Sequence, residues 1–160
     1  MGHSMTVGVG DCGVSSDPQA TIVTYALGSC VAVTVYDPVT RVGGLLHFML
    51  PDSAIDPDRA KREPHVYADT GIQSLLNLAA RLGAERSRLQ VKIAGGAQML
   101  SESATFSIGK RNGVAARKLL WKAGVNINGE ELGGTVSRTV MLEVRTGRVA
   151  LKEVAQRAEE

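Results

Sequence analysis

The sequence has few aromatic residues and no large excess of charge of either sign. Phe, Trp and Tyr make up 4% of the 160 residues, so the stacking platforms that bind single-stranded nucleic acid are missing. With 18 basic and 16 acidic residues, the formal net charge is only +2. A dedicated nucleic-acid binder has a strong basic excess, so we predict no nucleic-acid partner.

Long hydrophobic runs are missing too. No stretch is long enough to cross a bilayer and no signal segment opens the chain, so we predict no membrane insertion and a cytoplasmic location. The two cysteines, Cys12 and Cys30, allow at most one disulfide, and without a secretion signal we expect reduced thiols. Residues 1–4 (MGHS) are predicted to be an expression scar, which leaves a single domain over residues 5–160.

The remaining composition is that of an ordinary globular domain, with 44% hydrophobic and 21% charged residues. β-branched, apolar stretches predict strands, and apolar residues at helical spacing followed by glycine predict helices. The expected strands are 21–27, 30–36, 42–50, 89–96, 125–128, 135–145 and 148–154, and the expected helices are 69–84 and 109–124. Residues 52–67 are expected to form a long loop. The fold class is therefore α+β, with mainly antiparallel β-sheets covered by two principal α-helices.

The first predicted hairpin brings a thiol and an imidazole together. The segment "DPVT" is typical of a type I turn, and a turn centred between Pro38 and Val39 places Cys30 opposite His47. Directly opposed residues on antiparallel strands have Cβ atoms about 4.5–5.5 Å apart and share one face. The pairing depends on the register, because a bulge that shifts it by one residue would separate the two side chains.

A neighbouring thiol and imidazole can act as a nucleophile and its base. The thiolate is the attacking species, and an adjacent histidine can accept its proton and later protonate a leaving group. Gly28 and Ser29 allow a tight turn whose backbone N–H groups could face a developing oxyanion. Each residue also has a plainer interpretation: Cys30 as a small core residue and His47 as a satisfied, partly buried side chain. Considered together, Cys30 and His47 favour a catalytic role over these plainer interpretations.

Several segments resemble one family, the CheD chemoreceptor glutamine deamidases of bacterial chemotaxis. In chain order they are "LGSCVAV", a "DP" turn, "HFMLP", "YADTGIQSLL", "KIAGGAQM", "IGKRNGVAARKLL" and "GGTVSRTVMLEVRTGRV". The resemblance covers nearly the whole chain after the first four residues, and the ordered set is specific. It implies that a cysteine, a histidine and a threonine carry the activity, at Cys30, His47 and Thr24.

The resemblance also implies a reaction and its partners. Cys30 would attack the side-chain carboxamide of a receptor glutamine, and the thioester would be hydrolysed to glutamate with His47 as acid and base. Thr24 would orient His47 or bind the substrate amide, and no cofactor would be needed. The substrates would be methyl-accepting chemotaxis receptors, with a possible CheC partner. The alternative function is a non-catalytic binding module that regulates a CheC-type phosphatase of CheY, a role that would survive loss of Cys30.

A metal site is not predicted. The side chains that could ligate a metal, namely Cys12, Cys30, His47 and His65, lack any close paired spacing. Cys12 is interpreted as incidental to the motif and His65 as a solvated loop residue. The segment "AGGA" (94–97) is not followed by the residues that a phosphate-binding loop needs, so we expect it to form a tight turn lining the active-site face.

Three further expectations concern the C-terminal half. Trp121 is expected to pack on the sheet, and Arg138 to point inward as a paired structural residue. The second helix carries a basic cluster, Lys110, Arg111, Arg117, Lys118 and Lys122. This cluster is either a solvated face or a surface that attracts an acidic partner.

Overall fold

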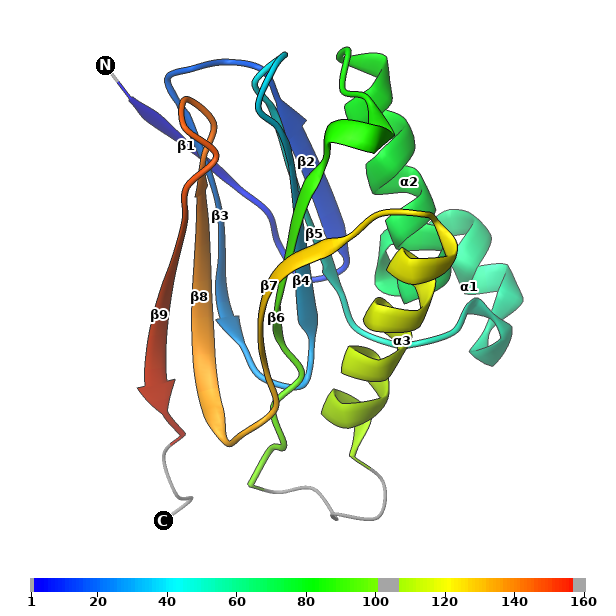
Figure 1. Ribbon diagram of the computed structural model, residues 1–160. Helices are drawn as coiled ribbons and strands as arrows, with labels where there is room; N and C mark the ends of the chain where they lie inside the picture. Colours follow the sequence, from blue (N-terminus) through cyan, green and yellow to red (C-terminus); the bar gives the residue numbers. More distant parts are fainter. Residues whose placement is uncertain (1, 101–106, 157–160) are drawn as a thin grey trace.

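The structure is a computed structural model that describes residues 2–100 and 107–156. Two β-sheets are stacked face to face, and the helices cover the outer side of one of them (Figure 1). The strands are β1 (His3–Thr6), β2 (Asp11–Ser15), β3 (Ala20–Leu27), β4 (Val31–Asp37), β5 (Val42–Phe48), β6 (Gln90–Gly95), β7 (Ile127–Leu132), β8 (Val136–Glu143) and β9 (Val149–Ala155). The α-helices are α1 (Pro57–Arg62), α2 (Ala68–Arg81) and α3 (Ile108–Lys122). None of the described helices is both long and apolar enough to cross a bilayer.

The strand order confirms the predicted fold class. One sheet has the order β1-β3-β8-β9 and the other has the order β2-β5-β4-β6-β7. Neighbouring strands are antiparallel except in the pairs β1–β3 and β6–β7, which are parallel. The predicted C-terminal hairpin is β8–β9.

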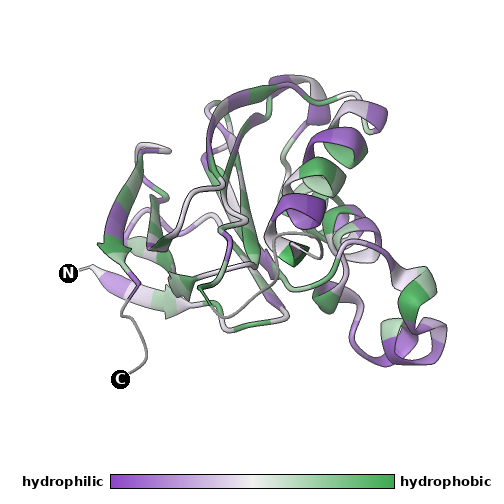
Figure 2. Ribbon diagram, turned by 90° about the horizontal axis from the view of Figure 1, so that it is seen from below, coloured by the Kyte–Doolittle hydropathy of each residue, from purple (hydrophilic) through white to green (hydrophobic). Residues whose placement is uncertain are grey.

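The five-stranded sheet is buried on both faces. Along β4, Val31, Val33 and Val35 belong to the core under the helices, whereas Ala32 belongs to the core between the two sheets. Successive side chains of a strand point to opposite faces, so an almost continuous apolar run supplies both cores. Figure 2, viewed from below, shows the layers side by side, with the helices on one side only.

The long segment after β5 is more ordered than predicted. In place of a loop over 52–67, it contains α1 and two 3₁₀ turns, η1 (Ser53–Ile55) and η2 (Pro64–Val66). A six-residue helix is too short to produce a periodic hydrophobic signal, which explains the error. His65 is correspondingly not a solvated loop residue: it is partly buried in η2, and its Nε2 lies 2.8 Å from the Ser74 hydroxyl.

Helix α3 presents a different side to the sheet from the one that apolar spacing suggests. Trp121, expected to pack on the sheet, is 79% exposed, and the apolar Val114 is 52% exposed. The buried side is instead formed mainly by small residues, Gly109, Asn112, Gly113, Ala116 and Leu120. At Gly109 a Cβ atom would lie only 2.2 Å from the Ala97 carbonyl oxygen. Because the helix approaches the neighbouring backbone this closely, large side chains are excluded from the contact and turn outward.

The first hairpin has the predicted strands but a different register. Asp37 pairs with Val42, and His47 is opposite Ala32 rather than Cys30. The turn includes Arg41 in a left-handed conformation with φ of 58°, which adds residues to the connection. Since the shift is two residues, the parity is kept, and Cys30 and His47 remain on one side of the sheet as diagonal neighbours.

Candidate active site

A hydrogen bond between the two sheets holds His47. The Thr24 hydroxyl on β3 lies 2.7 Å from Nδ1 of His47 on β5, and it donates to the Val7 carbonyl oxygen, also at 2.7 Å. Both side chains are buried, with exposures of 1% and 2%. A hydroxyl has a single proton, so once that proton goes to Val7, Nδ1 must donate to the Thr24 oxygen. This assigns the proton of the neutral ring to Nδ1 and leaves the lone pair on Nε2.

The environment of His47 keeps the ring neutral. Burial lowers its pKa from 6.5 to about 4, because the charged imidazolium is poorly solvated there. Nε2 is buried and has no hydrogen-bond partner among the described residues. A neutral imidazole with an unoccupied acceptor nitrogen is the form that a general base needs.

Cys30 lies immediately before β4, on the side of the sheet that carries His47. It is partly buried and packs against the core between the sheets, as Ala32 does. Diagonal neighbours on antiparallel strands have Cβ atoms somewhat closer than about 7–8 Å, a gap that an imidazole ring can largely bridge. Burial raises the pKa of the Cys30 thiol, so it is protonated at neutral pH and needs a base to become a nucleophile. Its sulfur forms no hydrogen bond with Nε2 of His47, which has no partner among the described residues, and a looser approach of the two atoms stays a prediction.

Two glycines fix the main chain at Cys30. Gly96 N–H donates to the Cys30 carbonyl oxygen at 2.8 Å, and Ala97 N–H donates to that of Gly28 at 2.9 Å. Gly95 has φ of 114°, and a Cβ atom there would lie 2.3 Å from the Cys30 oxygen. The "AGGA" segment is therefore the tight turn beside the cysteine that the sequence predicts. The role of the Gly28 and Ser29 turn in binding an oxyanion remains a prediction.

Asn112 is a site residue that the sequence analysis missed. Its side-chain nitrogen donates to the Ser29 carbonyl oxygen at 2.9 Å and to that of Met49 at 2.8 Å. The first acceptor precedes Cys30 and the second follows β5, so one fully buried amide joins the two segments that carry the thiol and the imidazole. The sequence did contain a signal for it, because Asn112 is a polar residue at helical spacing from Gly109 and Ala116.

Arg138 supports the same turn from the other sheet. As predicted, it is buried and paired, donating from one guanidinium nitrogen to the Gly95 and Gly133 carbonyl oxygens at 3.0 and 2.9 Å. Its Nε lies 3.5 Å from a Glu153 carboxylate oxygen, an ion pair without a well-formed hydrogen bond. Arg138 therefore ties β8 to the end of β6, where the glycine turn begins.

Cys12 lies apart from this site. It is on β2 and packs against the core under the helices, whereas Cys30 packs against the core between the sheets. Burial, with a smaller contribution from Asp11, raises the pKa of the Cys12 thiol to about 12. Both cysteines are free thiols. In the described part of the chain, no three His, Cys, Asp or Glu side chains are grouped so that they could hold a metal ion.

The arrangement can support thiol-based nucleophilic chemistry, and comparisons with known proteins give the family. A family model described as CheD chemotactic sensory transduction matches residues 49–153. A protein of Solibacter usitatus named probable chemoreceptor glutamine deamidase CheD is 51% identical over 157 residues, covering 98% of this chain and 93% of the relative. A similarly named protein of Pyrococcus abyssi is 43% identical over 156 residues, covering 96% and 94%. This chain belongs to the CheD family.

Proposed function

We propose that this protein is a chemoreceptor glutamine deamidase that converts glutamine side chains to glutamate through a Cys30 thioester. The observation that carries the proposal is the Thr24–His47 hydrogen bond, which leaves a neutral imidazole with a free Nε2 on the side of the sheet that carries the protonated Cys30 thiol. The relatives are named probable chemoreceptor glutamine deamidases, and these names support chemoreceptor glutamines as the substrate.

The first half of the reaction forms the thioester. Cys30 Sγ attacks the carboxamide carbon of glutamine while His47 Nε2 takes the thiol proton, and the carbonyl oxygen becomes an oxyanion. The carbon–nitrogen bond then breaks, and His47 returns the proton to the departing nitrogen, which leaves as ammonia. Because burial raises the thiol pKa and lowers that of His47, the proton moves during attack rather than in the resting protein.

The second half releases the product. A water molecule attacks the thioester carbon as His47 Nε2 takes one of its protons, and the carbon–sulfur bond breaks. His47 then protonates the sulfur, and the new glutamic acid loses its own proton to solvent. The backbone N–H groups of the Gly28–Cys30 turn bind the oxyanion in both halves. The steps are redox-neutral and draw only on water and this chain.

The experiment uses the cytoplasmic fragment of a methyl-accepting receptor and mass spectrometry. After incubation with the wild-type protein, specific receptor peptides should increase in mass by the difference between glutamate and glutamine. Cys30→Ala should leave the peptide masses unchanged while its own circular dichroism spectrum stays that of the wild type. Cys12→Ala is the matched control and should retain activity, because its thiol packs on the other side of the sheet. Conversion by Cys30→Ala at the wild-type rate would refute the proposal.

The same variant separates catalysis from a binding role. A non-catalytic module that regulates a CheC-type phosphatase would keep its effect when Cys30 is replaced, since its surface would be intact. Loss of deamidation with retained CheC binding would show both roles in one protein.

A further inference from the structure

Helix α3 exposes an apolar strip bordered by positive charge. Val114 and Trp121 lie on its outer side, about two helical turns from each other, and Trp121 is the single tryptophan of the chain. The exposed cations of this side are Lys110, Arg111, Lys118 and Lys122. Tryptophan and arginine are enriched at binding hot spots, so this combination marks a candidate interface.

Val114 lines a groove, and Trp121 lies outside its lining. A depression of about 610 Å³ runs between α3 and a second wall formed by Pro51, Asp52 and Asp69. Val114, Ala115 and Leu119 line it on the helix side, between the four cations. The α3 rim of the groove therefore carries both apolar side chains and positive charge.

The positive charges of this rim are available to a partner. No ion pair joins any of the four cations to a carboxylate among the described residues. Arg117, the fifth member of the basic cluster, differs because its guanidinium is paired with Glu130, with Nε 3.1 Å from a carboxylate oxygen. The carboxylates of the opposite wall are engaged by backbone or hydroxyl donors, Asp52 by Ala54 N–H and Asp69 by Ser53.

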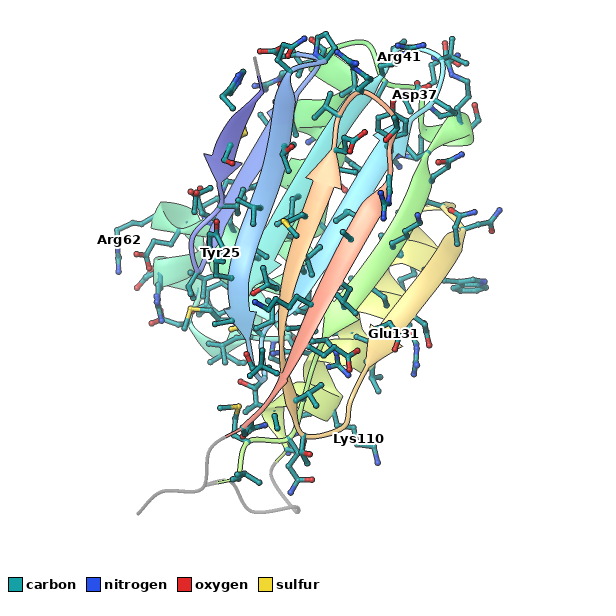
Figure 3. All side chains as sticks on the ribbon, turned by 90° about the vertical axis from the view of Figure 1, so that its left-hand side faces the viewer. Tyr25, Asp37, Arg41, Arg62, Lys110 and Glu131 are labelled. Atoms are coloured by element: carbon teal, nitrogen blue, oxygen red, sulfur yellow. The ribbon has the colours of Figure 1, made fainter. Side chains whose placement is uncertain are left out.

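The segments that line the groove are linked to the candidate active site. Pro51 follows His47 by four residues, and Asn112 in the first half of α3 donates to the carbonyl oxygen of Met49 and to that of Ser29, the residue before Cys30. Figure 3 shows Lys110 at the end of the molecule where α3 begins. From there the 15 residues of α3 extend for about 22 Å, so a helix docked along α3 could contact it over about four turns.

We propose that this groove docks an acidic amphipathic helix of the protein whose glutamine reaches Cys30. The partner's apolar stripe would cover Val114 and Trp121, and its carboxylates would face the lysines and Arg111. A flat anionic membrane fits less well, because the surface is concave and its far wall carries Asp52 and Asp69. The identity of the partner rests on the proposed deamidase function, but the binding surface does not require an active Cys30.

The test uses the fluorescence of Trp121. The probe is a synthetic helical peptide with glutamates on one side and leucines on the other, added to the Cys30→Ala protein so that no turnover occurs. Binding should shift the Trp121 emission to the blue. Lys118→Glu with Lys122→Glu should weaken binding about 10-fold or more, and added salt should weaken wild-type binding. The control pair Arg148→Glu with Lys152→Glu has the same charge change on β9 and its turn, and should bind like the parent protein.

Three outcomes would overturn the proposal: no shift with the peptide, equal weakening in both double variants, or a shift with anionic phosphatidylglycerol vesicles but not with the peptide. With active protein and receptor fragment, the α3 double variant should raise KM with kcat unchanged. Peptide binding without any deamidation by the wild type would contradict the proposed function and leave the docking surface standing.

Discussion

The Thr24 hydroxyl has one proton, and its destination decides which nitrogen of His47 can act as a base. Because the proton goes to the Val7 carbonyl oxygen, Nδ1 of His47 must be the donor, and Nε2 keeps its lone pair. In the proposed mechanism the basicity of Nε2 therefore depends on a residue of the other sheet, and Thr24 acts as a positioning residue for His47.

Replacing Thr24 tests this dependence. Thr24→Val keeps the shape but leaves Nδ1–H and the Val7 carbonyl without their partner, so the protein should lose about 1–3 kcal/mol of stability. Because the ring can then adopt the other tautomer, kcat for deamidation should fall on the order of 100-fold with little change in KM.

The control for this replacement is Thr24→Ser, which keeps the hydroxyl and should recover most of kcat. If valine and serine reduced kcat equally, the hydroxyl would have no role in setting the tautomer.

At the scale of elements, the sequence predicts which segments form strands and helices better than it predicts how they meet. β-branched runs identify β3, β4 and β5, but the register of the first hairpin depends on Arg41 in a left-handed conformation, which no Gly or Asn signals. The orientation of α3 is missed because small residues, rather than large apolar ones, make its contact with the sheet.

The same limits explain which site residues are predictable. Cys30 and His47 emerge from one hairpin, whereas Thr24 contacts His47 across two sheets and is identified only through the family resemblance. Asn112 is missed because its role depends on where α3 meets the loop before Cys30 and the end of β5.

Replacing Asn112 tests how α3 supports the candidate site. Asn112→Ala removes two donated hydrogen bonds and leaves buried carbonyl oxygens unpaired, so unfolding in urea should show a loss of about 2–3 kcal/mol. Since the amide links the thiol loop to the histidine strand, kcat should also fall, and a partial loss of kcat should persist at temperatures where the variant is fully folded.

Asn77→Ala is the matched control on α2. Its side chain is exposed and, within the described part of the chain, accepts a hydrogen bond from Gln73 alone, so stability should change by less than about 0.5 kcal/mol. Equal effects of the two substitutions would mean that the Asn112 bridge contributes nothing specific.

At the scale of the whole molecule, the site lies where two sheets and one helix meet. The helices cover only the five-stranded sheet, and the other sheet turns its outer face, including Tyr25 at 57% exposure, to solvent (Figure 3). The Thr24–His47 bond joins the two sheets, so protonation of His47 should affect global stability.

The sign of this effect follows from the pKa of His47. The folded value of about 4 lies below the value of 6.5 expected for an unfolded chain, so between these pH values the unfolded state binds more protons. The contribution of His47 is complete above pH 6.5 and is lost as the pH falls toward 4, by about 3 kcal/mol in total.

Urea unfolding between pH 7 and pH 4.5 checks this, with His47→Gln as the reference protein. The wild type should lose stability with falling pH more steeply than the variant. Parallel curves would show that His47 is not held neutral by burial.

Acid quenching during turnover tests whether Cys30 is the nucleophile. Low pH should trap the thioester between Cys30 and the receptor fragment, and mass spectrometry should find the fragment joined to the peptide that contains Cys30. The predicted result is an adduct at Cys30 alone, absent from Cys30→Ala. An adduct at Cys12, or undiminished ammonia release by Cys30→Ala, would contradict the claim.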